Sequence, residues 1–125
     1  MDITEQLESA LRQTILLLKD FPGETLNTKP STGGWSGAQA VQHLYLSEKD
    51  MAQLLATPAP PTDRNPEERA AEFENILLDF DRKMDAPPFL VPEEKHYDKS
   101  ELIKSLEDLI APILEAVRNN DLTQV

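Results

Sequence analysis

Apolar residues recur at helical spacing along the first part of the chain. From Asp2 to Lys19 an apolar side chain returns every three or four residues (Ile3, Leu7, Leu11, Ile15 and Leu18), which is the pattern of one buried helix face. Phe21-Pro22-Gly23 ends this helix, because the residue before a proline disfavours helix and glycine supplies a turn. The polar stretch from Glu24 to Gly34 predicts a connection.

A second helix is predicted from Ser36 to Ala56. Ser36 is a suitable N-cap, and Gln39, three residues later, completes a capping box. Trp35, just before the cap, is expected to pack back against the first turn near Ala40. The apolar positions that follow share one face (Val41, Leu44, Ser47 or Glu48, Met51 and Leu55). The proline-rich segment after the helix ends it, because proline lacks an amide donor.

A third helix is predicted from Pro66 to Met84. Asn65 is suited to the N-cap, and proline is favoured at the first helical position. An apolar stripe follows (Ala70, Phe73, Ile76 or Leu77, Phe80 and Met84). Pro87-Pro88 ends the helix, and the stretch from Phe89 to Tyr97 predicts an extended loop.

The fourth predicted helix, from Asp98 to Val117, has the most regular apolar stripe (Leu102, Leu106, Leu109, Ile113 and Val117). Asp98 and Glu101 repeat the spacing of a capping box. Pro112 lies inside the helix and lacks the amide that would bond to a carbonyl near Asp108. We therefore expect a kink at this point and not a break.

Four amphipathic helices predict an all-α fold, an up-and-down helical bundle of four helices with long proline-rich connections. A chain of 125 residues fits a single domain over residues 1–125. The helix from Pro66 to Met84 is expected either to flank the bundle or to take the place of one of its members. The three other helices are the long members of the bundle.

Composition narrows the function classes. With 12 basic and 23 acidic residues the net charge is −11, which disfavours binding to nucleic acid or to an anionic membrane. No cysteine is present, so disulfides, thiol nucleophiles and cysteine-ligated metals are excluded. The longest apolar run, Ile15–Leu18, has four residues, and the N-terminus carries acids where a signal peptide carries positive charge. We therefore expect a cytoplasmic protein.

The two histidines carry most of the possible chemistry. His43 lies in the middle of the second predicted helix, next to the apolar stripe. A histidine in this position can bind a metal or act as a base, or it can be a boundary residue whose nitrogens are satisfied by neighbours. His43 and Asp50 cannot hold one ion alone, since seven residues separate them by roughly 10 Å of helix. A second helix would have to contribute. His96 lies in a charged loop and is expected to be exposed.

The other candidate residues give weaker evidence for a chemical function. The acid pairs Glu67-Glu68 and Glu93-Glu94 fit a solvated surface better than an acid–base dyad. Gly33-Gly34 could present amides to an anion, but no phosphate-binding glycine motif is present and Ser36 occupies the cap. Trp35 could stack a ligand, and a role as a staple or core anchor explains it more simply. His43 is therefore the residue best placed for a role in catalysis or metal binding.

The run from Lys29-Pro30 through Gly33-Gly34-Trp35-Ser36-Gly37, followed by Val41-Gln42-His43-Leu44 and Glu48, resembles the DinB-like superfamily, also known as the YfiT-like proteins. Members are four-helix bundles, often dimeric, in which three histidines hold a divalent metal of the zinc or nickel type. Characterised relatives include thiol-dependent transferases and isomerases. The resemblance implies that His43 corresponds to the first metal ligand and that a small molecule is the substrate. The bound metal would lower the pKa of a coordinated water or thiol.

One family feature is missing. The resemblance implies two further ligands from an HxxxH pair on a last long helix, and this sequence has no HxxxH. We expect the metal site to be incomplete in these 125 residues, which are either a C-terminally truncated piece of a longer protein or a natural short form. Apolar surface near His43 would then lack its cover, and a homodimer would bury it.

Two functions from different classes remain open. One is a DinB-like metal-dependent enzyme of the thiol-transferase or hydrolase class, with His43 as the surviving ligand position. The alternative is a metal-free helical interaction or regulatory module, in which His43 is a boundary residue and Trp35 a core anchor.

Overall fold

The computed structural model describes residues 2–58, 60, 63–79, 81 and 85–122. Within these residues it contains helices and no strand, so the predicted all-α bundle is confirmed. The elements are α1 (Ile3–Asp20), α2 (Gly23–Leu26), α3 (Gly37–Glu48), α4 (Met51–Ala56), α5 (Ala70–Leu77), the 3-10 turn η1 (Pro88–Leu90) and α6 (Lys99–Asn119).

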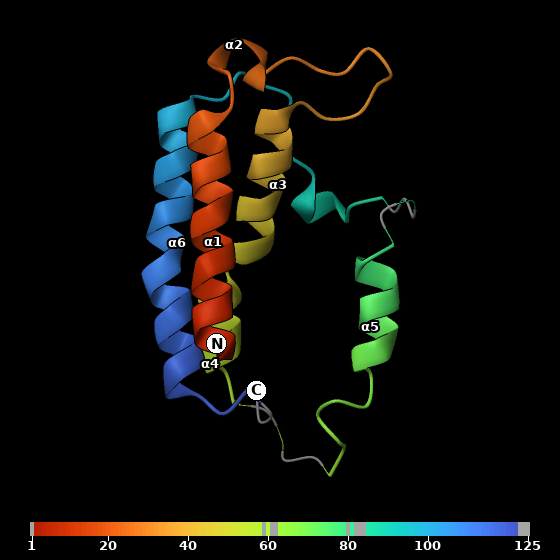
Figure 1. Cartoon of the computed structure of the whole chain (residues 1–125), viewed down its shortest axis with the longest axis vertical. Coiled ribbons are helices and arrows are strands. Elements are labelled where there is room, and N and C mark those ends of the chain that lie inside the picture. The colour runs from red at the N-terminus through yellow and green to blue at the C-terminus, as the bar shows by residue number, and fades with distance from the viewer. Residues whose placement is uncertain (1, 59, 61–62, 80, 82–84, 123–125) are drawn as a thin grey trace.

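The bundle consists of α1, the α3–α4 pair and α6, which run alongside one another (Figure 1). α6 is the element on which α1, α3 and α4 all pack. The chain runs up α1, down α3 and α4, up through α5 and down α6, so the up-and-down order is kept. However, α5 stands away from the other helices, on the α3 side. Of the two placements expected for the third predicted helix, the described residues therefore show the flanking one.

The two long helices lie close to their predicted ranges because local signals define their ends. α1 begins with a capping box in which the Asp2 side chain accepts from the Glu5 amide at 2.8 Å. At the start of α6 the Asp98 side chain accepts from the amides of Ser100 and Glu101. α6 continues through Pro112, as expected. The core contains Ile15, Leu18, Leu26, Ala38, Tyr97, Leu102, Leu106, Ile110 and Leu114.

The second predicted helix is interrupted. α3 ends at Glu48 and α4 begins at Met51, with Asp50 at φ −103° and ψ 5°, outside helical geometry. One turn earlier the Ser47 hydroxyl donates to the His43 carbonyl at 2.8 Å, a contact that competes with the helix ladder. The predicted face is also shifted: Leu44 is 39% exposed, whereas Ala38 is fully buried and Val41 and Tyr45 pack against the core.

The third predicted helix is shorter than expected. Residues 66–69 form turns, and α5 covers Ala70–Leu77 only. The Asn65 side chain accepts from the Glu67 amide, so the predicted N-cap closes a turn and not the helix. Short helices depend on packing for their stability, and no other described helix packs closely on α5. The predicted positions Phe80 and Met84 lie outside the described residues.

The two predicted loops contain short helical turns and meet each other. α2 lies in the connection from Glu24 to Gly34, and η1 lies at the start of the loop that ends at Tyr97. The Asn27 side chain holds both backbone groups of Tyr97, since its amide donates to the carbonyl at 2.9 Å and its oxygen accepts from the amide at 2.7 Å. We call this pair of contacts the Asn27–Tyr97 clamp. None of the described helices is long and apolar enough to cross a membrane.

Candidate functional site

His43 lies half-buried on α3 and faces the loop that carries η1. Its Nδ1 lies 2.8 Å from the backbone oxygen of Leu90. A carbonyl oxygen only accepts hydrogen bonds, so Nδ1 carries the proton and donates it. In the tautomer with the proton on Nδ1, the lone pair of the ring lies on Nε2. Sequence reasoning missed this partner, because Leu90 is 47 positions away and contributes a backbone atom.

Trp35 covers the imidazole of His43. The two ring centroids are 5.0 Å apart and the ring planes are inclined at 45°. The indole is 37% exposed, so of the two expected roles, staple or core anchor, the core anchor is wrong. The structure pairs the indole with the imidazole, one turn beyond the expected contact at Ala40, because His43 offers a flat, half-buried surface on the same side of the helix.

The donor set around His43 does not fit a metal centre. Within the described ranges no three side chains of the His, Cys, Asp and Glu types come together in a way that could hold an ion. Asp50 is exposed beyond the end of α3, and His96 is exposed in the loop before α6. His43 is thus a single donor, and no metal-dependent step is derived from it.

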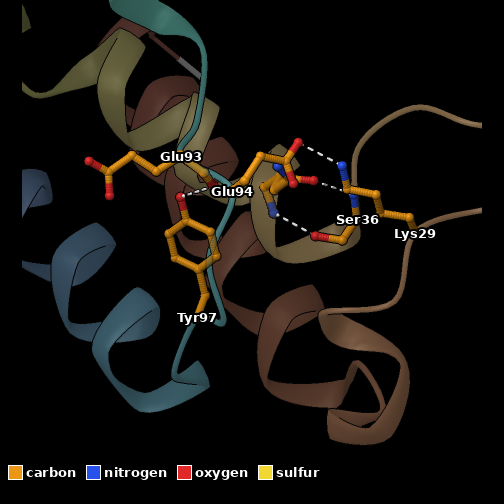
Figure 2. Close-up of polar contacts among 6 residues, drawn as sticks. Lys29, Ser36, Glu93, Glu94 and Tyr97 are labelled. Carbon is orange, nitrogen blue, oxygen red and sulfur yellow. Dashed lines mark hydrogen bonds and ion pairs between the residues drawn. The ribbon is translucent and has the colours of Figure 1, made fainter.

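The start of α3 is closed by its own side chains. The Ser36 hydroxyl accepts from the Gln39 amide at 3.1 Å, and the Ser36 amide donates to the Gln39 side-chain oxygen at 3.0 Å (Figure 2). The predicted capping box is confirmed. Gly33 and Gly34 have φ values of 90° and 99°, a left-handed conformation that glycine adopts without strain, and they turn the chain into the cap.

A polar cluster connects this cap to the loop before α6. Lys29 and Glu94 form an ion pair at 2.6 Å, and the Tyr97 hydroxyl donates to the Glu93 carbonyl at 2.9 Å (Figure 2). The hydrogen bond from Lys29, followed by the nearby Gln39 amide, holds the pKa of Glu94 below its usual range. The Gln39 side-chain nitrogen is buried and makes no hydrogen bond of standard geometry. The Glu94 contact with Lys29 is on the surface and contributes little to stability.

The remaining sequence candidates lie on the surface. His96 and both predicted acid pairs, Glu67-Glu68 and Glu93-Glu94, are exposed. His96 borders a polar pocket of about 200 Å³ between α3 and the start of α6. Nothing in the described structure joins His96 to His43.

A second site, which the sequence patterns did not single out, lies at the lower end of the bundle. A pocket of about 320 Å³ is enclosed by residues of α1, α3, α4 and α6 together with Leu122. We call it the Glu48 pocket, because Glu48 is the one charged side chain among its described lining residues. Burial raises the pKa of Glu48 above its ordinary value. In the described part of the chain its carboxylate has no hydrogen-bond or ion-pair partner. Local patterns could not reveal a pocket that four helices form together.

Replacing Glu48 with glutamine is expected to stabilise the protein at neutral pH. A carboxyl group with a raised pKa destabilises the folded state once it is ionised, and this cost grows as pH rises through the folded pKa. Below the ordinary pKa near 4.5 both side chains are neutral and the cost is absent. Urea denaturation of both proteins across this pH range measures the difference. A Glu48→Gln stability gain that is equally large at the acidic end contradicts the assignment.

Comparison with known proteins identifies the family of the chain. The family model of the DinB superfamily matches residues 6–124 of the 125-residue chain. No curated protein and no solved structure matches the chain. The matched span includes the Trp35-Ser36 start of α3 and His43, the same residues that carry the sequence resemblance. The chain therefore belongs to the DinB superfamily.

Proposed function

We propose that this DinB superfamily member is a helical interaction module that pairs with a second copy of itself and uses no metal centre built within one chain. The observation that carries the proposal is the unpartnered apolar face of α5. Phe73 is 48% exposed and Leu77 69% exposed, and Leu78 just beyond the helix is 66% exposed. A short amphipathic helix is marginal in water unless its apolar face is covered.

The charge around α5 indicates what could cover it. Residues 63–81 contain seven acids (Asp63, Glu67, Glu68, Glu72, Glu74, Asp79 and Asp81) and two arginines. A groove of about 390 Å³ between α1 and α6 is lined by Leu16, which is 58% exposed, by Arg12 and Lys19, and by one acid, Glu107. Lys19 pairs with Glu107 at 3.5 Å and Arg12 with Glu8 at 3.0 Å, and both ion pairs are on the surface, where an acidic partner can compete for the cations. On a chain with a net charge of −11, a groove with an exposed leucine and two cations is a suitable complement for the acidic α5 segment.

The position of α5 favours a second copy as the partner. α5 stands on the α3 side of the bundle, whereas this groove lies on the α1–α6 side (Figure 1). The bundle itself thus separates α5 from the groove of the same chain. Two copies can each place α5 in the groove of the other, and this reciprocal arrangement closes as a two-fold dimer.

Replacing Leu77 with lysine tests the pairing. Leu77 is exposed, so the folded monomer should tolerate the change, whereas burying a lysine in the α1–α6 groove removes a leucine contact and adds repulsion from Arg12 and Lys19. We expect the dimer dissociation constant, measured by sedimentation equilibrium, to rise about tenfold or more. Leu54→Lys is the matched control, since Leu54 is 62% exposed on α4 and lies outside both surfaces. A monomer at all concentrations, or equal effects of the two variants, would falsify the pairing.

A metal-dependent enzyme, with a small-molecule substrate, is the second candidate function. One observation favours it: Nδ1 of His43 donates to a backbone carbonyl, which is how many metal-bound histidines are oriented with Nε2 free for the ion. The other ligands would have to come from outside the described residues. Metal analysis of the purified protein and of its His43→Ala variant distinguishes the metal-dependent enzyme from the metal-free interaction module. One bound ion per chain that is lost in the variant overturns the metal-free proposal.

A further inference from the structure

We propose that the Glu48 pocket binds a small amphiphilic cation, an alkylammonium or arylalkylammonium compound whose charged group pairs with Glu48. This inference goes beyond the proposed self-association. The pocket shares no lining residue with the α1–α6 groove and none with α5. Success or failure of one proposal therefore leaves the other standing.

The walls of the pocket suit a hydrocarbon body. The bundle helices contribute seven apolar lining residues, and Leu122 after α6 adds an eighth: Ile3, Leu7, Leu11, Met51, Leu55, Ile113, Val117 and Leu122. Ile113 and Val117 are buried, at 3% and 8% exposure, and they form the floor. Ile3 and Leu122 are 62% and 40% exposed and form the rim. The volume of about 320 Å³ is at the small end of the range for ligand sites, so the ligand is small.

Glu48 supplies the polar contact that would orient the ligand. It is half-buried among apolar side chains, and none of the described lysines or arginines lines the pocket. A carboxylate in such surroundings has lost part of its hydration without gaining a partner, which is unfavourable. An ammonium group from a ligand would restore that partner through a charge-assisted hydrogen bond.

The charge of the chain selects among ligands of the same shape. A net charge of −11 attracts cations and repels anions. An alkanol of equal length would bury the same hydrocarbon and leave Glu48 without a counterion, and an alkanoate would add a like charge beside it. We therefore expect the binding affinity to be highest for the ammonium compound, lower for the alcohol and lowest for the carboxylate.

Titration calorimetry of the full chain with octylammonium, octanol and octanoate at about pH 7 tests this order; the amine is fully protonated there. Octylammonium should bind at least about tenfold more tightly than octanol, and octanoate should not bind. Glu48→Gln should reduce octylammonium affinity to that of octanol. Glu115→Gln, which removes the same charge from an exposed position on α6, should leave the affinity unchanged.

Methyl NMR of Met51 and Ile113 locates the binding independently of the variants. Both signals should shift with octylammonium, because both side chains line the pocket. The proposal is overturned if octylammonium and octanol bind alike, or if the two glutamine variants lose equal affinity, which would indicate bulk charge attraction alone. Shifts confined to other parts of the chain would also overturn it, as would a wild-type protein that binds none of the three compounds.

Discussion

Truncating Leu106 to alanine is expected to lower the free energy of unfolding by about 2–5 kcal/mol. Leu106 is 4% exposed and lies in the middle of α6, the helix on which the other members of the bundle pack. Removing its side chain deletes contacts to the core and leaves a cavity that the surrounding helices can fill only in part. Urea denaturation followed by circular dichroism measures the loss.

Leu17→Ala is the matched control for Leu106→Ala. Leu17 has the same side chain in a helix and is 74% exposed. Its truncation removes little buried area, so we expect a change within about 0.5 kcal/mol. Comparable losses in the two variants would mean that α6 is not the centre of the packing. A large loss of stability in Leu106→Ala and not in Leu17→Ala supports the central position of α6 in the packing.

The Asn27–Tyr97 clamp is expected to contribute the second largest effect. Asn27→Ala leaves the amide and the carbonyl of Tyr97 without their partner in a part-buried position, and each unsatisfied group costs about 1–3 kcal/mol. We expect a total loss of about 2–3 kcal/mol, at the lower end of the sum for two groups, because the position is only part-buried. The clamp joins the connection after α1 to the loop before α6, so the amide of Tyr97 should also exchange its hydrogen faster.

Two further variants sharpen this prediction. Asn27→Asp keeps the acceptor for the Tyr97 amide and loses the donor to the Tyr97 carbonyl, so its stability should lie between those of the wild type and Asn27→Ala. Thr28→Ala removes only a long, exposed contact of 3.4 Å to Glu24 and should have little effect. If Asn27→Ala is as mild as Thr28→Ala, water replaces the clamp and the prediction is wrong.

Features that depend on neighbours within one turn could be predicted from the sequence. The starts of α3 and α6 lie where Ser36 and Asp98 were expected to cap them, because a cap needs only the amides two or three residues later. The motif from Lys29 to Glu48 indicated the superfamily in the same way, since it is a short run of neighbouring residues.

Features that depend on partners far away in the chain could not be predicted from the sequence. The apolar stripe of the third predicted helix looked equivalent to the others, yet α5 is short and stands outside the bundle. Periodicity shows that a face is apolar, and it does not show which helix covers that face. For the same reason the pattern could not distinguish a staple or a core anchor at Trp35 from the observed position over His43, where the indole is partly exposed.

By itself the sequence determined the helical class, the ends of the two long helices, the capped start of α3 and the family of the chain. Only the tertiary structure decided that a carbonyl of Leu90 orients His43, that α5 lies apart and that Glu48 faces an apolar pocket. The physical reason is range: caps and helix propensity act over about four residues, whereas burial and desolvation arise when segments far apart in the chain meet.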